Sequence, residues 1–216
     1  MIVAIDGTLA SGKGSIAQRI AMKYGLPHLD TGRLYRATGV AALIEGIDLS
    51  DEERLAALAE GLDFQAFDDG DLRTAEAGQA ASQVAALPGV RAALLAAQRR
   101  FAAQPGGAVL DGRDIGTVIC PDAPVKFWVD ADVEVRAWRR WSELRARGEA
   151  LDFNDMLDQV RARDARDAGR ANAPMSRAPD AHLIDTTHLT IDQAVGRARV
   201  VIESAQPPEA HSVSPD

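Results

Sequence analysis

The sequence predicts an α/β fold with a parallel sheet, because short apolar runs alternate with segments of helical periodicity. The runs expected to form strands are residues 2–5, 28–30, 108–111, 125–129 and 182–185. With 216 residues, of which 46% are hydrophobic, the chain can form one domain around a substantial core. We therefore expect a five-stranded parallel sheet with helices on both faces.

Local signals place the ends of several helices. Ser50 with Glu53, and Thr190 with Gln193, have the spacing of a capping box. Pro88 suits a first helical turn, and the glycines expected at helix ends are Gly25, Gly46, Gly148 and Gly169.

The stretch 62–73 breaks the helical pattern, and a short hairpin is expected there. It opens an inserted, mostly helical unit that runs to about residue 101. We expect a single domain over residues 1–204 and a disordered tail over 205–216, where three prolines occur.

The segment after the first strand has the glycine spacing of a phosphate-binding loop. A strand, a glycine-rich loop and a helix start direct several backbone N–H groups at one point, where the helix dipole also favours negative charge. Lys13 adds a positive charge there. Such loops bind the phosphates of a nucleoside triphosphate. The residues expected to form it are Gly7, Thr8, Leu9, Ala10, Ser11, Gly12, Lys13, Gly14 and Ser15.

Composition narrows the class of partner. The net charge of −8 argues against a nucleic-acid polymer, because phosphate backbones attract basic surfaces. No run of 18 apolar residues occurs and the N-terminus enters a strand at once, so we expect no membrane span, no signal peptide and a cytoplasmic location.

Cys120 is the only cysteine, and we expect it to be a small buried hydrophobe. Of the 24 basic residues 21 are arginine, the side chain best suited to forked phosphate binding.

Two further segments follow predicted strands, at the sheet edge where open α/β folds bind ligands. Asp111 ends one strand, which suits a contact with Mg²⁺ or its waters, and the Arg113-Asp114 pair follows between glycines. Thr31 and Arg36 follow another strand and could bind a phosphate. Taken alone, the first segment could be a surface turn with an incidental ion pair, and the second an ordinary turn opening a helix.

Arginines also mark two predicted helices. Arg163, Asp167 and Arg170 fall on one helical face, which by pattern alone favours a solvated salt-bridge ladder. The helix with Arg136, Arg139, Arg140, Arg145 and Arg147 could be a solvated basic face or a flap that brings cations onto a triphosphate.

Together these segments resemble one family, bacterial cytidylate kinase. Five segments occur in the family's order, and the resemblance runs from residue 1 to about 204. They are the phosphate loop, DTGRLYR (30–36), QAASQVAALPGVR (79–91), LDGRDIGTVICPDAPVKFWVDA (110–131) and RDARDAGRANAP (163–174). The resemblance implies a P-loop nucleoside-monophosphate-kinase fold, with a nucleotide-binding insertion at about 62–101 and a small lid at about 137–153. It also implies ATP and Mg²⁺ as cofactors, CMP and dCMP as substrates, no membrane or nucleic-acid partner, and a monomer.

The resemblance carries site roles onto this sequence. Residues 7–15 would hold the ATP phosphates, and Lys13, Arg113 and Arg139 would act on the transferring phosphoryl group. Ser15 and Asp111 would serve Mg²⁺, partly through water. The residues implied to bind CMP are Thr31, Arg36, Arg91 and Arg113 near its phosphate, Arg163 and Asp167 at the ribose, and Ser82, Asp114 and Arg170 at the cytosine.

Three departures stand out. Ala10 replaces a frequent glycine, Ser15 replaces threonine, and the hairpin before the QAASQV segment is cut to 67–72. The alternatives left open are a kinase of UMP, AMP or dephospho-coenzyme A, a GTP-dependent switch protein, and a non-catalytic nucleotide-binding module. No Asn-Lys-x-Asp guanine-reading segment occurs, which argues against the switch protein.

Overall fold

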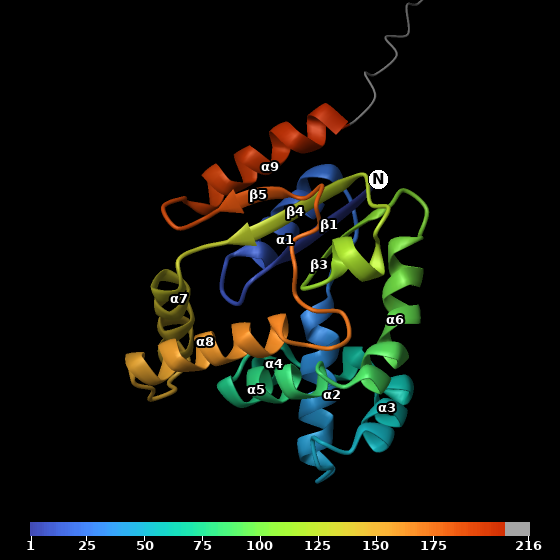
Figure 1. Cartoon of the computed structure of the whole chain (residues 1–216), viewed down its shortest axis with the longest axis vertical. Helices are drawn as coiled ribbons and strands as arrows, with labels where there is room; N and C mark the ends of the chain where they lie inside the picture. Colours follow the sequence, from blue (N-terminus) through green and yellow to red (C-terminus); the bar gives the residue numbers. More distant parts are fainter. Residues whose placement is uncertain (206–216) are drawn as a thin grey trace, which may run out of the picture.

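The computed structural model describes residues 1–205 and holds one parallel sheet (Figure 1). The strand order is β2-β3-β1-β4-β5. The bounds are β1 Ile2–Gly7, β2 His28–Asp30, β3 Ala108–Gly112, β4 Val125–Asp130 and β5 His182–Asp185. All five predicted strands are confirmed, and β1, β3 and β4 each run slightly further than expected.

Helices cover both faces of this sheet. On one face, α1 (Lys13–Tyr24) and α9 (Ile191–Ala205) pack on the valine and isoleucine side chains of β1, β3, β4 and β5. On the other face, the end of α6 (Pro88–Ala102) and the single π-helical turn η2 (Ile115–Ile119) pack against Ala4 and Leu110. The alternation of side chains along β1 explains both contacts, since Val3 and Ile5 point to one face and Ala4 to the other.

A helical layer lies beyond the carboxyl edge of the sheet (Figure 1). It consists of α2 (Thr31–Ile44), α3 (Glu52–Gly61), η1 (Phe64–Ala66), α4 (Asp69–Leu72), α5 (Ala75–Val84) and α6. Leu34, Leu55, Val84 and Leu94 form part of its separate core. All of these helices belong to the connection between β2 and β3, which includes the insertion predicted at about 62–101 and begins earlier, at Thr31.

The predicted hairpin at 62–73 is wrong. The residues form η1 and α4, two short helical turns, and Asp63 caps the first through Gln65 N at 3.0 Å. Among residues 64–72 only Leu72 is buried, so two paired strands would have no apolar face to cover. Arg33 instead holds this segment on α2 by donating to the Phe67 carbonyl at 2.6 Å and by pairing with Asp69.

The capping predictions are confirmed at one helix and wrong at another. Thr190 and Gln193 form the reciprocal capping box of α9. At α3 the cap is Asp51, whose carboxylate accepts from Arg54 N at 3.2 Å, rather than Ser50. Ser50 donates to Asp48 in the preceding turn, which leaves the longer aspartate side chain to cap the helix.

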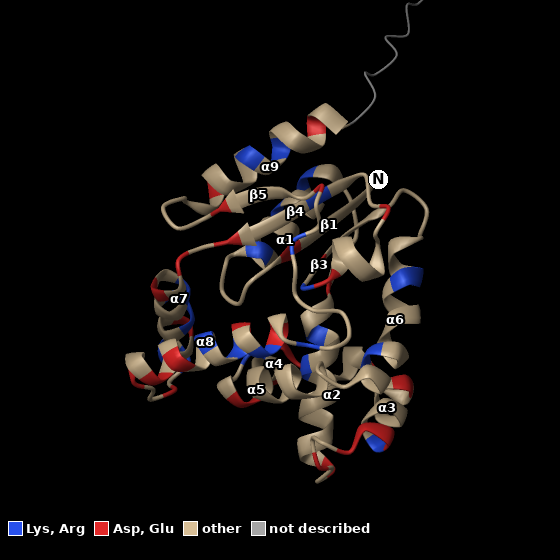
Figure 2. Cartoon of the chain, in the orientation of Figure 1, with Lys and Arg blue, Asp and Glu red and all other residues tan. Residues whose placement is uncertain are grey.

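Two charged helices flank the helical layer, and we name them the α7–α8 pair (Figure 2). They comprise α7 (Val133–Ala146) and α8 (Phe153–Ala168), packed on Ala137, Leu144 and Met156. The lid predicted at 137–153 covers most of α7 and the loop that follows it. The tail predicted over 205–216 lies, after Ala205, outside the described residues. Among residues 1–205, no single helix has the length and hydropathy to cross a membrane, and α5 with α6 reaches them only across a 99° bend.

Candidate functional site

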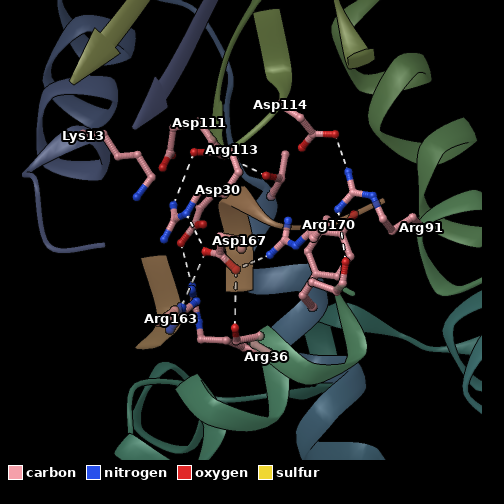
Figure 3. Close-up of a pocket in the computed structure, with 17 residues that line it drawn as sticks. Lys13, Asp30, Arg36, Arg91, Asp111, Arg113, Asp114, Arg163, Asp167 and Arg170 are labelled. Carbon is pink, nitrogen blue, oxygen red and sulfur yellow. Dashed lines mark hydrogen bonds and ion pairs between the residues drawn. The ribbon is translucent and has the colours of Figure 1, made fainter. Parts of the chain in front are cut away.

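A pocket of about 70 Å³ lies where the sheet edge meets the helical layer and α8 (Figure 3). The phosphate loop, β3 and its following turn, α2, α5, α6 and α8 all contribute side chains to it. Its lining includes Lys13, Asp111 and all nine residues predicted to bind CMP, which are Thr31, Arg36, Ser82, Arg91, Arg113, Asp114, Arg163, Asp167 and Arg170. The fold therefore brings together residues that lie as much as 157 positions apart in the sequence.

The phosphate loop connects β1 to α1 as expected. A Cβ on Gly7 would lie 2.0 Å from the Val129 carbonyl oxygen, so only glycine allows β1 to end this close to β4. The loop then turns through Ala10, whose φ of 56° is in the left-handed region, before Gly12 at 90° opens α1. Ala10, which replaces a frequent glycine, therefore adopts a left-handed conformation that residues with a Cβ disfavour.

Lys13 lies at the pocket end of this loop, and its ammonium donates to the Thr8 carbonyl at 3.3 Å. Burial and the nearby Arg113 lower the pKa of Lys13 to about 7, although the carboxylates of Asp111 and Asp30 oppose the shift. A dianionic phosphate in the pocket would reverse the balance, because an opposite charge favours the ammonium form.

The strand β2 ends in a carboxylate that holds one of the phosphate-binding candidates. Asp30 caps α2 through Arg33 N at 3.3 Å and pairs with Arg36 at 2.7 Å. Burial acts to raise the pKa of Asp30, but the Arg36 guanidinium outweighs it and the pKa lies below its usual value. The hydroxyl of Thr31 donates to the Asp111 carbonyl at 2.8 Å. The donor that the sequence assigned to a phosphate is therefore already engaged.

Asp167, from α8, lies at the centre of a cluster of three arginine side chains in the pocket. Its carboxylate pairs with Arg113 at 3.1 Å and with Arg170, while Arg163 lies 3.9 Å away and the Ser82 hydroxyl donates from 3.4 Å. Burial acts to raise the pKa of Asp167, but the three guanidinium groups lower it further than burial raises it. The ladder predicted on one helix face is thus a buried network, because α8 turns that face onto α5 and the turn after β3.

At the opposite end of the pocket from Lys13, Asp114 pairs with Arg91 (Figure 3). Both side chains are buried, and the Arg91 guanidinium lies over the Tyr35 ring, 5.7 Å from its centroid. The sequence placed Arg91 at the CMP phosphate and Arg170 beside Asp114. In the structure Arg91 is the direct partner of Asp114, because α6 delivers it to the far wall, and Arg170 pairs with Asp167.

Arg139 lies apart from this pocket. Its guanidinium donates to the Thr186 hydroxyl at 3.0 Å and carbonyl at 2.7 Å, in the turn between β5 and α9. There it lines a second cavity of about 250 Å³ with Ser11, Gly12 and Ser15. The same cavity is lined by Ile16 of α1 and Ala194 of α9.

The carboxylate of Asp111 lies beside the start of α1 and accepts a hydrogen bond from His28 Nε2 at 2.7 Å. Asp30 is its register partner on β2. Among residues 1–205 no cluster of three or more histidine, cysteine or acidic side chains could enclose a metal. One or two carboxylates next to a phosphate loop nevertheless suit Mg²⁺, which takes the rest of its oxygen ligands from phosphates and water.

Sequence reasoning missed several residues of the site. His28 holds Asp111, Tyr35 supports Arg91, and Arg166 donates to the Ser82 hydroxyl at 2.8 Å. His28 and Tyr35 lie two and five residues from Asp30, within segments already singled out. Arg166 follows Arg163 on α8, but only the packing of α8 on α5 shows its partner.

Comparisons with known proteins identify the family of this chain. The family model described as cytidylate kinase matches residues 3–204. The chain is 56% identical to the cytidylate kinase of Methylocella silvestris and 55% identical to that of Bradyrhizobium sp., covering 95% of this chain in both cases and 95% and 97% of those proteins. It is also 54% identical to the Caulobacter vibrioides protein of that name, over 95% of this chain and 96% of the relative.

Solved structures support the fold alone. An uncharacterized protein from Eubacterium ventriosum shares 15% identity with a TM-score of 0.56, over 94% of this chain and 99% of that one. TT1252 from Thermus thermophilus shares 18% identity with a TM-score of 0.50, over 96% and 98%. With the family match spanning nearly the whole chain and the family's segments meeting in one pocket, the chain belongs to the cytidylate kinase family.

Proposed function

We propose that this protein transfers the γ-phosphoryl group of ATP to CMP or dCMP, giving ADP and CDP or dCDP, as a step in pyrimidine nucleotide metabolism. The observation that carries the proposal is a single pocket with Lys13 of the phosphate loop at one end and the Asp114–Arg91 pair at the other. A nucleoside monophosphate has the same polarity, with its phosphate and its base at opposite ends.

The phosphate of CMP is assigned to the end near Lys13, where Arg36 and Arg113 line the pocket. Arg163 and Asp167 take the ribose, and Ser82 and Arg170 lie against Asp167 on the way to the base end. Arg91 moves in this assignment from the phosphate to the base, with Asp114. We also propose that the enzyme is monomeric and cytoplasmic.

The choice of base follows from hydrogen-bond polarity. Cytosine presents an amino donor at position 4 and an acceptor at N3, whereas uracil presents the reverse. A carboxylate at Asp114 accepts from the amino group, and a guanidinium next to it, such as Arg91, donates to the acceptor. Uracil would instead leave buried polar groups unpaired, at about 1–3 kcal/mol for each group.

No general base is needed for the transfer. The attacking atom is a phosphate oxygen whose second pKa is about 6, so it is largely deprotonated at neutral pH. The protein aligns donor and acceptor and neutralises charge around a loose transition state. Lys13 and the arginines supply the fixed cations. Ser15 and Asp111 would hold Mg²⁺, partly through water, and the ion would supply further neutralisation of the phosphate charge.

Substrate has to open the pocket in which it binds. The cavity of about 70 Å³ is smaller than the 300–1,000 Å³ that ligand sites usually offer, because guanidinium–carboxylate pairs occupy it. A phosphate arriving between Arg36 and Arg113 would exchange with Asp30 and Asp167 for the same donors. Each arginine thus has an anionic partner before and after binding, which limits the free-energy cost of breaking its pair with the aspartate.

A coupled assay of ADP release against a panel of monophosphates tests the proposal. We expect CMP and dCMP to be the preferred acceptors with ATP as donor. Preference for AMP or UMP, or tight nucleotide binding without turnover, would overturn it in favour of another small-molecule kinase or a binding module.

A further inference from the structure

Asp6 is a buried acid that the proposed chemistry does not use. It is the last polar residue of β1 before the phosphate loop, is 3% exposed, and lies in register with Gly112 on β3. Its carboxylate accepts hydrogen bonds from the turn that follows β3. One oxygen accepts from Ile115 N and the other from Gly116 N, both at 2.7 Å.

These two amides open η2, the turn that directly follows Arg113 and Asp114. Asp114 occupies the N-cap position of η2, but among the described residues its side chain makes no capping bond and pairs instead with Arg91. Asp6 therefore supplies, from a different strand, the cap that Asp114 would ordinarily provide. Because Asp6 caps η2, the Asp114 carboxylate does not have to, and it faces the pocket instead.

Holding a carboxylate at this position has a cost. Burial raises the pKa of Asp6 to about 7, although hydrogen bonds from Gly116 and Ile115 oppose the shift. The surroundings are tight as well, since a Cβ on Gly116 would lie 3.4 Å from the Asp6 carboxylate and 3.2 Å from the Lys126 side chain. The carboxylate and the turn therefore hold each other in one relative position.

We propose that Asp6 is a positioning residue for cytosine recognition, which fixes the Arg113–Asp114 turn relative to the phosphate loop. This inference rests on the proposed function. Asp6 is joined by one peptide bond to Gly7, whose backbone packs on β4 without room for a side chain. The residue that anchors the donor loop, Gly7, and the residue that anchors the acceptor turn, Asp6, are thus neighbours in the chain, so one peptide bond links the two halves of the site.

The test is the ratio of kcat/KM for CMP to that for UMP in Asp6→Asn. Asparagine has nearly the same shape, but its amide nitrogen cannot accept from the second N–H. Because a misplacement of about 1 Å can cost on the order of 100-fold, we expect kcat/KM for CMP to fall at least about tenfold and the CMP:UMP ratio at least about threefold. The dissociation constant of ATP, measured without CMP, should stay within about twofold.

Val3→Ala is the matched control, because Val3 is equally buried in β1 but packs on the opposite side of the sheet from η2. It should lower the melting temperature and leave the CMP:UMP ratio unchanged. The ratio does not depend on the fraction of active enzyme, so partial unfolding does not disturb it. Where Asp6→Asn yields no folded protein, Asp6→Ser, which keeps one small acceptor and leaves room for water, is measured by the same ratio.

The outcomes separate the two proposals. Wild-type protein that does not prefer CMP contradicts the proposed function. Wild-type protein that prefers CMP, with an Asp6 variant whose ratio equals that of Val3→Ala, overturns the role of Asp6 and leaves the proposed function standing. A lowered ratio with unchanged ATP binding supports both.

Discussion

The two ends of the pocket are built in different ways. The phosphate-loop end consists of backbone amides and one lysine within nine consecutive residues, with its shape set by Gly7, Ala10 and Gly12. The base end consists of buried contacts between side chains far apart in the sequence, such as the Arg91–Asp114 ion pair, 23 residues apart, and the Ser82–Asp167 hydrogen bond, 85 residues apart. In the proposed function, the first end binds phosphate charge whatever group is attached, and the second end discriminates among bases.

Removing the ammonium from the phosphate-loop end should have the largest effect. Lys13→Met should lower kcat by about 10²–10³-fold, the usual cost of deleting one donor aimed at a developing charge. CMP affinity, measured by calorimetry without ATP, should change only a few-fold. Lys23→Met, on the exposed side of the same helix, serves as the control and should keep normal turnover. A near-normal rate for Lys13→Met would show that the transferring phosphate lies elsewhere.

The two arginines that flank Asp114 sharpen the contrast within the acceptor site. Arg91→Met should lower the CMP:UMP ratio of kcat/KM about 10-fold or more, because it leaves a buried carboxylate without its partner. Arg113→Met should lower kcat/KM for both nucleotides alike, because a phosphate carries no information about the base. Parallel kinetics with CMP and UMP measure both effects. If Arg113→Met changed the ratio and Arg91→Met did not, the assigned orientation of CMP would be reversed.

A proton should accompany phosphate binding at the phosphate-loop end. The pKa of Lys13 is lowered to about 7 in the free protein, and a bound triphosphate raises it, so at pH 8 ATP binding takes up a proton. Affinity should accordingly fall as the pH rises above about 7, by at most tenfold per pH unit. Calorimetry at pH 8 in two buffers of different ionisation enthalpy measures the uptake. Lys13→Arg, which stays charged, should show none, and equal uptake by both proteins would assign the proton to another group.

Relief of backbone strain should give the smallest effect. Ala10 has a φ of 56°, a left-handed conformation that costs a residue with a Cβ roughly 1–2 kcal/mol. Ala10→Gly removes this cost, but the greater entropy of glycine in the unfolded chain offsets about 0.4–1 kcal/mol of the gain. The net gain in the free energy of unfolding should be about 1 kcal/mol in urea denaturation. Gly7→Ala, which drives a Cβ to 2.0 Å from Val129 O, should destabilise strongly. A loss of stability in Ala10→Gly would show that the left-handed turn is not strained.

The sequence predicts the phosphate-loop end of the pocket better than the base end. Strand positions and the phosphate loop follow from local patterns, and all five strands are confirmed. The hairpin at 62–73 failed because that segment is held by Arg33 on α2 rather than by strand pairing. The Asp114–Arg91 pair and the contact of Arg139 with Thr186 were not foreseen, for a related reason. Each depends on how a helix packs against a distant turn, which no local spacing encodes. The capping of η2 by Asp6 has the same long-range origin.

The most direct test of the central claim is a crystal structure with CMP and a non-hydrolysable ATP analogue bound together. We predict the cytosine amino group within hydrogen-bond distance of Asp114, the CMP phosphate between Arg36 and Arg113, and the γ-phosphate beside Lys13 in line for attack. CMP bound with its base toward Lys13, or two nucleotides in cavities that do not meet, would contradict it.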